Sequence, residues 1–390
     1  MVEPAARTRS IEPFYVMEVV KEAARLQASG SSVIHMSIGE PDFAAPAPVR
    51  RAAVEAIERG ATQYTPALGI QPLRQAIADW YATRYGLRLD AERVVVTAGA
   101  SAALLLAFAA LLERDAEVLM PDPTYPCNRH FVATFEGRAR LIPCGPQTRF
   151  QLTAADVESN WTAASRGVLL ASPSNPTGTS IRPDALRSLI ATVRSLGGFV
   201  VVDEIYQGLS YDDRPTTALA LDDDAIVASS FSKYFCMTGW RLGWLVVPQT
   251  LLAVIERLAQ NLFICPSAVA QHAALACFEP ESIAIYEQRR AEFRRRRDFL
   301  VPALRRLGFG VPVVPDGAFY IYADVSRFAA DSWDFAFEVL HATGVCIVPG
   351  RDFGSAQPHR YVRISYANAY ERLEEAIGRL EAFLSGRCRA

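Results

Sequence analysis

The sequence predicts an α/β protein, with a large domain built on a mostly parallel sheet flanked by helices and a smaller α+β domain. Short apolar runs that are typical of buried strands alternate with helical patterns through the middle of the chain. The chain has 390 residues, which is too long for one compact core. We expect the large domain to span residues 46–290, and the smaller domain to combine residues 1–45 with residues 291–390.

Composition and charge exclude several classes of protein. The chain is 51% hydrophobic and 21% charged with a net charge of −2, so it has no overall attraction for nucleic acid or an anionic membrane. Seven cysteines without a C-x-x-C pair favour reduced thiols, and five scattered histidines give no expectation of a metal site. The longest apolar run, 102–112, is too short to cross a bilayer, and no N-terminal segment resembles a signal peptide. We therefore expect a cytoplasmic protein.

The N-terminal part predicts helices and loops around one short strand. Apolar residues at helical spacing predict helices over 13–28, 48–59 and 71–85. A short apolar strand, 33–36, precedes the motif S-I-G-E-P-D-F at 37–43, in which Gly39 permits a close approach of the backbone. Tyr64 lies in the loop 60–70, where a tyrosine usually just packs against the surface.

The middle of the chain predicts the parallel sheet. Apolar strands are expected at 94–96, 117–120, 139–143, 168–171, 199–202 and 225–228. Polar or turn-rich motifs follow them: T-A-G-A-S at 97–101, P-D-P-T-Y-P-C-N at 121–128, S-P-S-N-P-T-G at 172–178 and D-E-I-Y at 203–206. Since ligands bind beyond the carboxyl ends of parallel strands, these motifs are expected to line one crevice. The small residues at 97–101 suit a phosphate at a helix N-terminus, although many such turns bind nothing.

The C-terminal part predicts the smaller domain. From residue 251 the pattern is helical, and one long helix is expected to run through the arginine-rich stretch 289–297 to residue 307. That stretch is interrupted by Glu292 and Phe293 and predicts a solvated helix face. A strand within 312–324, a helix over 332–343, strands at 345–349 and 361–366, and a helix over 371–385 complete the chain.

Lys233 is the residue that most needs an explanation. It is one of two lysines among the 40 basic residues, so 40 − 2 leaves 38 arginines, which neither lose their proton nor attack a carbonyl. The other, Lys21, falls on the polar side of an amphipathic helical pattern and is expected at the surface. Lys233 instead follows a buried strand and sits among hydroxyls and aromatic residues. These features favour a reactive amine.

In these motifs the sequence resembles the class I/II aminotransferases of the fold-type I pyridoxal phosphate (PLP) family, and is aspartate aminotransferase-like. The resemblance runs from S-I-G-E-P-D-F to R-I-S-Y-A, and its most specific part is S-F-S-K-x-x-x-M-x-G-W-R-L-G at 230–243. It implies a Schiff base on Lys233, Asp203 at the pyridine nitrogen, and Tyr206 and Asn175 at the O3′ oxygen of the ring. The chemistry of the side chain agrees with the role implied for Asp203. The negative charge of a carboxylate keeps the ring nitrogen protonated, and a protonated ring accepts electrons more readily.

The resemblance implies further contacts with cofactor and substrate. Ser230, Arg241 and the backbone of Gly99, Ala100 and Ser101 would hold the phosphate, with the Ser101 hydroxyl adding a contact. Tyr125 would stack on the ring, and Tyr64 would reach the phosphate of the neighbouring subunit. Arg363 would bind the substrate α-carboxylate beside Gly39 and Asn175, because its fork matches a carboxylate. Without the surrounding motifs, Arg241 or Arg363 would be equally well interpreted as part of a surface ion pair.

Two departures from the family pattern bear on specificity. Cys236 stands where the family usually has glycine, and a packed small side chain is the simpler reading of it. No arginine in N-L-F-I-C-P-S-A at 261–268 is placed to pair with the distal carboxylate of a dicarboxylic substrate. Phe14, Tyr15, Ile38 and Phe263 are candidates for an apolar side-chain pocket.

The resemblance implies a homodimeric PLP-dependent aminotransferase with shared active sites. An L-amino acid would displace Lys233 from its aldimine, and a ping-pong reaction would pass the amino group to a 2-oxo acid such as 2-oxoglutarate. A C–S lyase or another elimination or decarboxylation enzyme of the same fold would carry the same cofactor motifs and stays open. A regulator that only senses a ligand is a third reading, but no DNA-binding module precedes residue 37.

Overall fold

The largest unit of the protein is a seven-stranded sheet in the order β2-β8-β7-β6-β5-β3-β4. The structure is a computed structural model that describes residues 2–211 and 216–387. The strands are β2 (Val94–Thr97), β3 (Glu117–Asp122), β4 (Arg138–Pro143), β5 (Ser165–Ala171), β6 (Phe199–Asp203), β7 (Ile226–Ser230) and β8 (Gly243–Val246). Within this sheet β8 alone runs antiparallel to its neighbours. The prediction of a mostly parallel central sheet is therefore confirmed.

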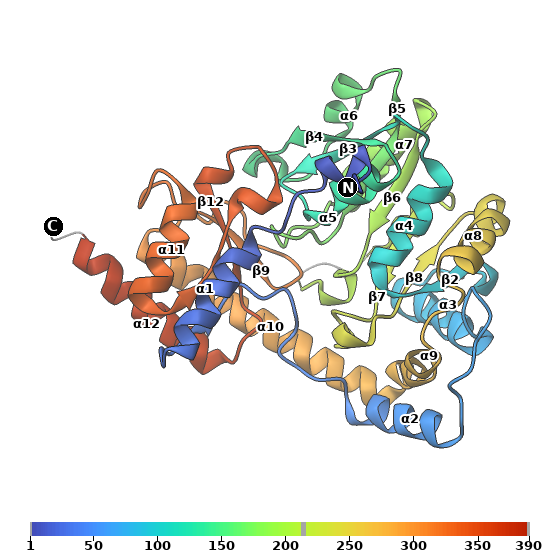
Figure 1. Ribbon diagram of the computed structural model, residues 1–390, viewed down its shortest axis with the longest axis horizontal. Helices are drawn as coiled ribbons and strands as arrows, with labels where there is room; N and C mark the ends of the chain where they lie inside the picture. Colours follow the sequence, from blue (N-terminus) through green and yellow to red (C-terminus); the bar gives the residue numbers. More distant parts are fainter. Residues whose placement is uncertain (1, 212–215, 388–390) are drawn as a thin grey trace.

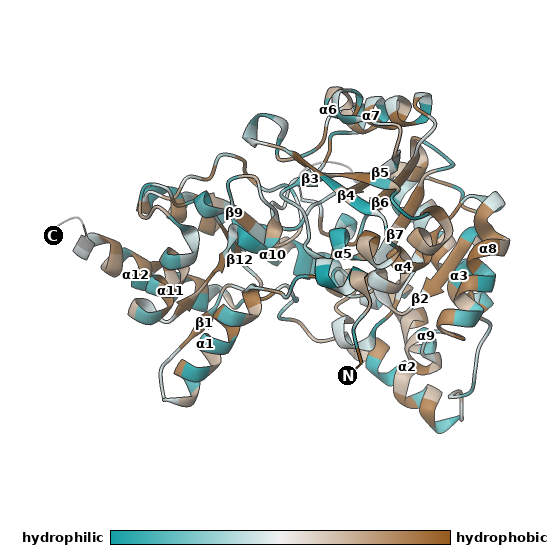
Figure 2. Cartoon of the chain, turned by 45° about the horizontal axis from the view of Figure 1, so that its top comes forward, coloured by the Kyte–Doolittle hydropathy of each residue, from teal (hydrophilic) through white to brown (hydrophobic). Residues whose placement is uncertain are grey.

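Helices cover both faces of this sheet because its central strands are apolar on both sides. Val200 and Val202 of β6 face one cluster with α3 (Gln71–Tyr85) and α7 (Pro183–Ser195), whereas Val201 faces a second cluster with α4 (Gly99–Leu111) and α8 (Gln249–Leu262). Figure 2 shows hydrophobic residues along these strands. Two shorter helices belong to this unit: α5 (Cys127–Thr134) packs against β4, and α6 (Ala154–Asn160) packs against α7.

A smaller unit combines the two ends of the chain. β1 (Ile34–His35) pairs in parallel with β10 (Val345–Cys346), and β11 (Val348–Pro349), β12 (Tyr361–Ser365) and β9 (Tyr320–Asp324) form an antiparallel sheet. Helices α1 (Val16–Ala28), α11 (Ser332–Thr343) and α12 (Tyr370–Arg387) pack around these strands. Figure 1 shows α1, in blue, beside these C-terminal elements in red. The domain boundaries expected at residues 45/46 and 290/291 stay a prediction.

The long helix α10 (Pro280–Leu307) connects the two units (Figure 1). One end lies near α2 (Ala47–Glu58), beside which α9 (Ala268–Leu275) also packs, and the helix also packs against α12. Single-turn 3₁₀ helices complete the chain: η1 (Ala6–Ser10), η2 (Ala91–Arg93), η3 (Pro146–Thr148), η4 (Gln207–Leu209), η5 (Ala218–Ala220), η6 (Thr238–Trp240), η7 (Ala276–Phe278), η8 (Gly350–Phe353) and η9 (Pro358–Arg360). Among the described residues, no helix is both long and apolar enough to span a membrane.

The arginine-rich stretch of α10 corrects one expectation. Arg296 and Arg297 are 3% and 5% exposed, so the predicted solvated face is wrong for these two residues. Arg296 Nη1 pairs with Asp42 Oδ1 at 2.8 Å, and Arg297 Nη1 donates to the carbonyl of Pro315 at 2.9 Å. A buried guanidinium is tolerated when its donors are satisfied, and here they hold the loop that contains Asp42 and the segment before β9 against the helix.

Candidate active site

A cavity of about 400 Å³ lies where the carboxyl ends of the parallel strands face the smaller unit. The structure brings most of the predicted site residues together here. The predicted residues that line it are Gly39, Ala100, Ser101, Tyr125, Asn175, Asp203, Tyr206, Ser230, Lys233, Arg241 and Arg363. Its volume lies within the range of small-molecule sites in proteins.

The register of the sheet explains why residues far apart in sequence meet at this edge. Asp203 ends β6 and lies opposite Ala171 at the end of β5 and Ala228 in β7. Ser230 ends β7 and lies opposite Gly243 of β8, which also pairs with Thr97 at the end of β2. The strand ends therefore stand in a row, and the segments that follow them carry the polar side chains into the cavity.

Lys233 lies just beyond β7, with its amine inside the cavity. Its Nζ donates to the carbonyl oxygen of Gly39 at 2.5 Å. Burial, together with the positive charges of Arg363 and Arg241, lowers the pKa of Lys233 to about 8, although the negative charges of Glu40 and Asp203 oppose the shift. A lysine with this pKa has a substantial unprotonated fraction near neutral pH, which a nucleophile or a base requires.

Asp203 is a buried carboxylate facing the same cavity. Its Oδ1 accepts a hydrogen bond from the backbone N–H of Ile205 at 3.0 Å. Burial raises the pKa of Asp203 to about 6, although the Ile205 amide and the charge of Lys233 both act to lower it. A cationic ligand group next to this carboxylate would relieve the cost of its burial. A protonated pyridine nitrogen is a group of that kind.

Arg363, in β12, brings a buried guanidinium to the side of the cavity formed by the smaller unit. Its Nη1 donates to Asn175 Oδ1 at 3.0 Å, and its Nη2 donates to the carbonyl of Ser37 at 2.7 Å. The Nε atom is buried without a hydrogen-bond partner among the described residues. The guanidinium carbon also lies 4.6 Å from the centre of the Tyr320 ring. The group is thus held in a fixed orientation and retains donor capacity for an anion.

The N-terminus of α4 and the guanidinium of Arg241 form a site suited to a dianion. The helix begins at Gly99, and its N-cap residue, Ala98, has no side chain to satisfy the first amides. Gly99 has φ +83°, and a Cβ atom there would lie 2.6 Å from Arg241 Nη2. The Ser230 hydroxyl and the Ser101 side chain border the same region. Free amides at a helix N-terminus beside an arginine fit a phosphate, so these residues are compatible with pyridoxal phosphate.

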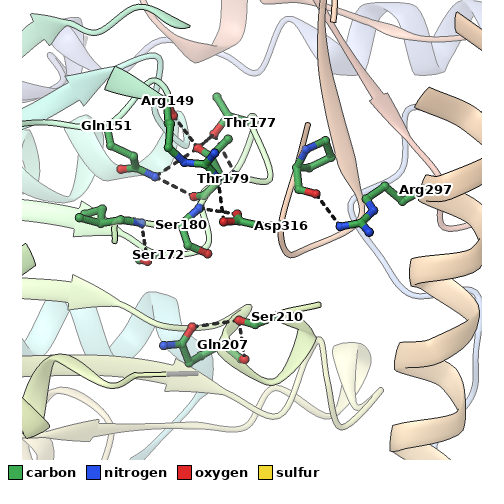
Figure 3. A network of polar contacts seen from close by, with 12 residues as sticks. Arg149, Gln151, Ser172, Thr177, Thr179, Ser180, Gln207, Ser210, Arg297 and Asp316 are labelled. Atoms are coloured by element: carbon green, nitrogen blue, oxygen red, sulfur yellow. Dashed lines mark hydrogen bonds and ion pairs between the residues drawn. The ribbon is translucent and has the colours of Figure 1, made fainter. Parts of the chain in front are cut away.

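A network of polar contacts, drawn in Figure 3, holds the loop that carries Asn175 in place. Asp316 accepts from the backbone N–H of Ser180 at 2.8 Å and pairs with Arg149 at 2.7 Å. The side-chain amide of Gln151 donates to the carbonyl of Thr179 at 2.8 Å. These contacts join the loop after β5 to the segment before β9, so the larger sheet and the smaller unit position Asn175 together.

Tyr320, at the start of β9, was not predicted as a site residue. Its hydroxyl lies 2.8 Å from the Tyr206 hydroxyl, and it lines the cavity next to Arg363. The motif G-A-F-Y-I-Y-A-D predicted the strand but could not indicate its partner. In the structure β9 pairs with β12, with Ser365 opposite Tyr320, which brings Tyr320 to the face that carries Arg363.

One side of the cavity is apolar, and most of it comes from the N-terminal segment. Phe14 and Ile38 line it, as predicted for an apolar pocket. Tyr15 and Phe263 do not: the Tyr15 ring packs edge-on against Trp333, and Phe263 packs against the sheet face that α4 and α8 cover. The sequence also missed three lining residues from the first turns of α1: Val16, Met17 and Val20.

Two other sequence expectations fall outside the cavity. Tyr64 is 83% exposed and does not line the cavity of its own chain, so its expected contact with a neighbouring subunit stays a prediction. Cys236 is buried and has φ +53°. This left-handed conformation favours glycine, which explains in physical terms why glycine is the usual residue in the related motif.

Comparison with known proteins agrees with this geometry. The family model "Aminotransferase class I and II" matches residues 31–380. A valine–pyruvate aminotransferase of Mycobacterium tuberculosis is 41% identical, over 98% of this chain and 99% of its own. The crystal structure of an aminotransferase from the same organism superposes with a TM-score of 0.95 at 41% identity, covering 99% of this chain and 100% of that one. The aspartate aminotransferase of Thermus thermophilus with maleate gives a TM-score of 0.92 at 31% identity, covering 98% and 100%.

Proposed function

Because the chain belongs to the class I and II aminotransferases, which depend on pyridoxal phosphate, we propose that it passes an amino group from an L-amino acid to a 2-oxo acid by a ping-pong reaction. The observation that carries this proposal is the convergence of Lys233, Asp203, Arg241 and Arg363 on one cavity. When bound, the cofactor supplies an electron sink that weakens the Cα–H bond of the substrate.

The proposed cofactor site follows the chemistry of the side chains. Asp203 holds the ring nitrogen, Asn175 and Tyr206 donate to the ring oxygen, and Tyr125 covers one face of the ring. The phosphate is bound by Gly99, Ala100, Ser101, Ser230 and Arg241, and by Tyr64 of a second subunit in a homodimer with shared active sites. The free helix N-terminus at α4 and the close approach of Arg241 to Gly99 support the phosphate assignment.

Arg363 is the proposed anchor of the substrate α-carboxylate. Its orientation by Asn175 and Ser37, together with the further N–H donors of its guanidinium, supports a charge-assisted contact with a carboxylate. The backbone at Gly39 lies on the same side of the cavity and completes this end of the substrate site. Fixing the carboxylate orients the Cα–H bond toward the amine of Lys233, which takes and returns the proton.

The lining favours amino acids with apolar side chains. Among the described residues that line the cavity, the cations are Lys233, Arg241 and Arg363, and each already has a proposed role. The distal carboxylate of 2-oxoglutarate, the acceptor expected from the sequence, would therefore need a cation from elsewhere. A monocarboxylate such as pyruvate, which the name of the Mycobacterium tuberculosis relative includes, needs none. Comparing the two acceptors at equal concentration with one donor decides between them.

The proposed cellular setting is the reducing cytoplasm. The described cysteines are all free, which suits that compartment.

Replacement of Lys233 tests the function directly. The variant K233A should lose amino transfer by at least about a thousandfold, because both the nucleophile and the base disappear. It should also lose the pyridoxyl adduct that borohydride fixes on this residue in the wild type. The other lysine provides a matched control, and K21A should retain wild-type rates, since Lys21 lies on an exposed face of α1.

Normal transamination by K233A would contradict the assignment. Release of ammonia from the donor without any 2-oxo acid would instead indicate an elimination enzyme.

A further inference from the structure

We propose that Asp352 is a positioning residue for substrate selectivity: it holds the N-terminal turn of α1 so that Val16, Met17 and Val20 form the apolar wall of the substrate cavity. This assignment rests on the proposed function. It concerns the part of the site that recognises the substrate side chain, and not the groups that carry out the chemistry.

Asp352 supplies the N-terminal cap that α1 lacks in its own sequence. The N-cap residue of α1 is Tyr15, which makes no side-chain capping bond. The two carboxylate oxygens of Asp352 instead accept from the backbone N–H groups of Tyr15, at 2.8 Å, and Val16, at 2.5 Å. Asp352 is 2% exposed, so these bonds form away from bulk water. A carboxylate at a helix N-terminus satisfies free amides and interacts favourably with the helix dipole.

The segment 350–356, which carries Asp352, is fastened to the end of β3. The carboxylate of Asp122 accepts from the backbone N–H groups of Ser355 and Ala356, at 2.8 and 3.0 Å. The backbone N–H of Thr124 donates to the carbonyl of Phe353 at 2.7 Å. Since the next residue along, Tyr125, lines the cavity, the position of α1 is set relative to the same edge of the sheet that builds the rest of the site.

Arg129, in α5, reinforces this connection. Its Nη1 donates to the carbonyl of Asp352 at 3.1 Å, and its Nη2 pairs with Glu12, just before α1, at 3.2 Å. Arg129 thereby connects both Glu12, which precedes α1, and Asp352, which caps α1, to the large unit.

Apart from these polar contacts, this end of the helix is held by partly exposed side chains: Val16 packs against the cluster around Tyr322 and Phe353, and the Tyr15 ring packs against Trp333. The buried residues of α1 are Val19 and Ala23, which pack with Leu340 and Cys346 in the smaller unit. Met17 is 48% exposed. Loss of the cap should therefore displace the first turn and its cavity-lining side chains while the rest of α1 stays packed.

The catalytic side chains are held by other elements. Asp203 ends β6, Lys233 follows β7 and Arg363 lies in β12. Displacement of the wall should therefore weaken binding of a large apolar side chain more than binding of a methyl group. A competing effect is electrostatic: burial raises the pKa of Asp352, and the charge of Arg363 acts against that rise, so the two groups lie close enough to influence each other. That effect would act on the α-carboxylate, and hence on every amino donor equally.

The experiment compares D352N with the wild-type holoenzyme, using L-leucine, L-valine and L-alanine as donors and one fixed 2-oxo acid as acceptor. An asparagine side chain keeps one acceptor oxygen, but its NH2 group would face the other backbone N–H group, so that one of the two cap hydrogen bonds is lost. We expect the ratio of kcat/KM for leucine to that for alanine to fall about tenfold, mainly through KM, as the loss of a charge-assisted hydrogen bond predicts. The valine ratio should fall by less.

D156N is the matched control. Asp156 takes part in the capping box of α6 in the large unit, where its carboxylate accepts from the Thr153 N–H at 2.9 Å, and no residue of α6 lines the cavity. This variant removes a comparable helix cap and should leave the leucine-to-alanine ratio at its wild-type value.

A double-mutant cycle with M17A gives a second readout. It separates an effect of D352N through the wall from a general effect of D352N on folding. If Asp352 acts through the wall, D352N should lower the ratio much less in an M17A background than in the wild type.

Two results would overturn the positioning role: an unchanged leucine-to-alanine ratio, including an equal fall for all donors, or additive effects of the two substitutions. Absence of transfer by the wild type from any donor would contradict the proposed function instead.

Discussion

At the scale of single residues, the site brings together Lys233 and Asp203, and burial disfavours the charged form of each. Burial lowers the pKa of Lys233 to about 8 and raises the pKa of Asp203 to about 6. Each group alone is costly in a folded protein, and a cofactor that pairs with both relieves that cost. Groups with such shifted pKa values are common at functional sites.

The lysine leads to a prediction about pH. In the cofactor-free protein, the pKa of Lys233 lies below its unfolded value of about 10.4, so the unfolded chain binds more protons between pH 8 and that value. The contribution of Lys233 to the free energy of unfolding should therefore rise with pH across this window. In K233M, which has a similar volume and no charge, this rise should disappear, and the variant should be more stable than the wild type at pH 7.

Urea unfolding of both cofactor-free proteins at pH 7, 8.5 and 10 measures the effect. The stability difference should shrink as the pH rises, because the wild-type amine loses its charge. A difference that is constant over this range would show that the charge of Lys233 is not penalised in the fold.

At the scale of elements, loops after the parallel strands carry the chemistry, and close backbone packing fixes their shape. Gly178, in the loop after β5, has φ +66°, and a Cβ there would lie 2.6 Å from Pro315 Cβ and 2.7 Å from the carbonyl oxygen of Tyr320. The loop is thus pressed against the segment that leads into β9. Asn175 and Tyr320 are positioned by this one contact surface.

G178A should therefore both destabilise the protein and impair the site. The left-handed backbone costs about 1 kcal/mol with alanine, and the clash with backbone atoms adds about 2 kcal/mol or more. G197A is the control, because Gly197 has φ +76° with no atom within 4 Å of its Cβ position, so only the backbone cost applies. Denaturant unfolding should separate the two variants, and kcat/KM should fall in G178A alone. Equal stabilities would mean that the loop relaxes without strain.

At the scale of the whole molecule, the sequence predicted the sheet and its functional edge better than the contacts between the two units. Apolar strands followed by polar motifs predicted that Asp203, Asn175 and Lys233 would lie close together, because strand direction determines which ends meet. Tyr320 and the wall on α1 depend on how the smaller unit packs against the sheet, and the burial of Arg296 depends on its contacts with Asp42 and Tyr366 within that unit. No local pattern encodes such a contact, since its partners lie far apart in the chain.

The ion pair between Arg296 and Asp42 tests how much the stability of the site depends on contacts within the smaller unit. It joins α10 to the motif S-I-G-E-P-D-F, which also holds Gly39, the acceptor for Lys233. D42A leaves a guanidinium that is 3% exposed with fewer partners, which should lower the free energy of unfolding by about 2 kcal/mol. The substrate KM should rise in the same variant, because Gly39 lies on the loosened segment.

E281A provides the control for an ion pair of the same type on the surface. Glu281 faces Arg51 at 3.8 Å with both side chains more than half exposed, so its loss should change stability by less than about 0.5 kcal/mol. Thermal or urea unfolding and donor kinetics on both variants measure the contrast. If D42A behaved like E281A in both assays, the contact between α10 and the motif would contribute nothing to the site, and the position of Gly39 would be set by other contacts, such as the pairing of β1 with β10 and the hydrogen bond from Arg363 to Ser37.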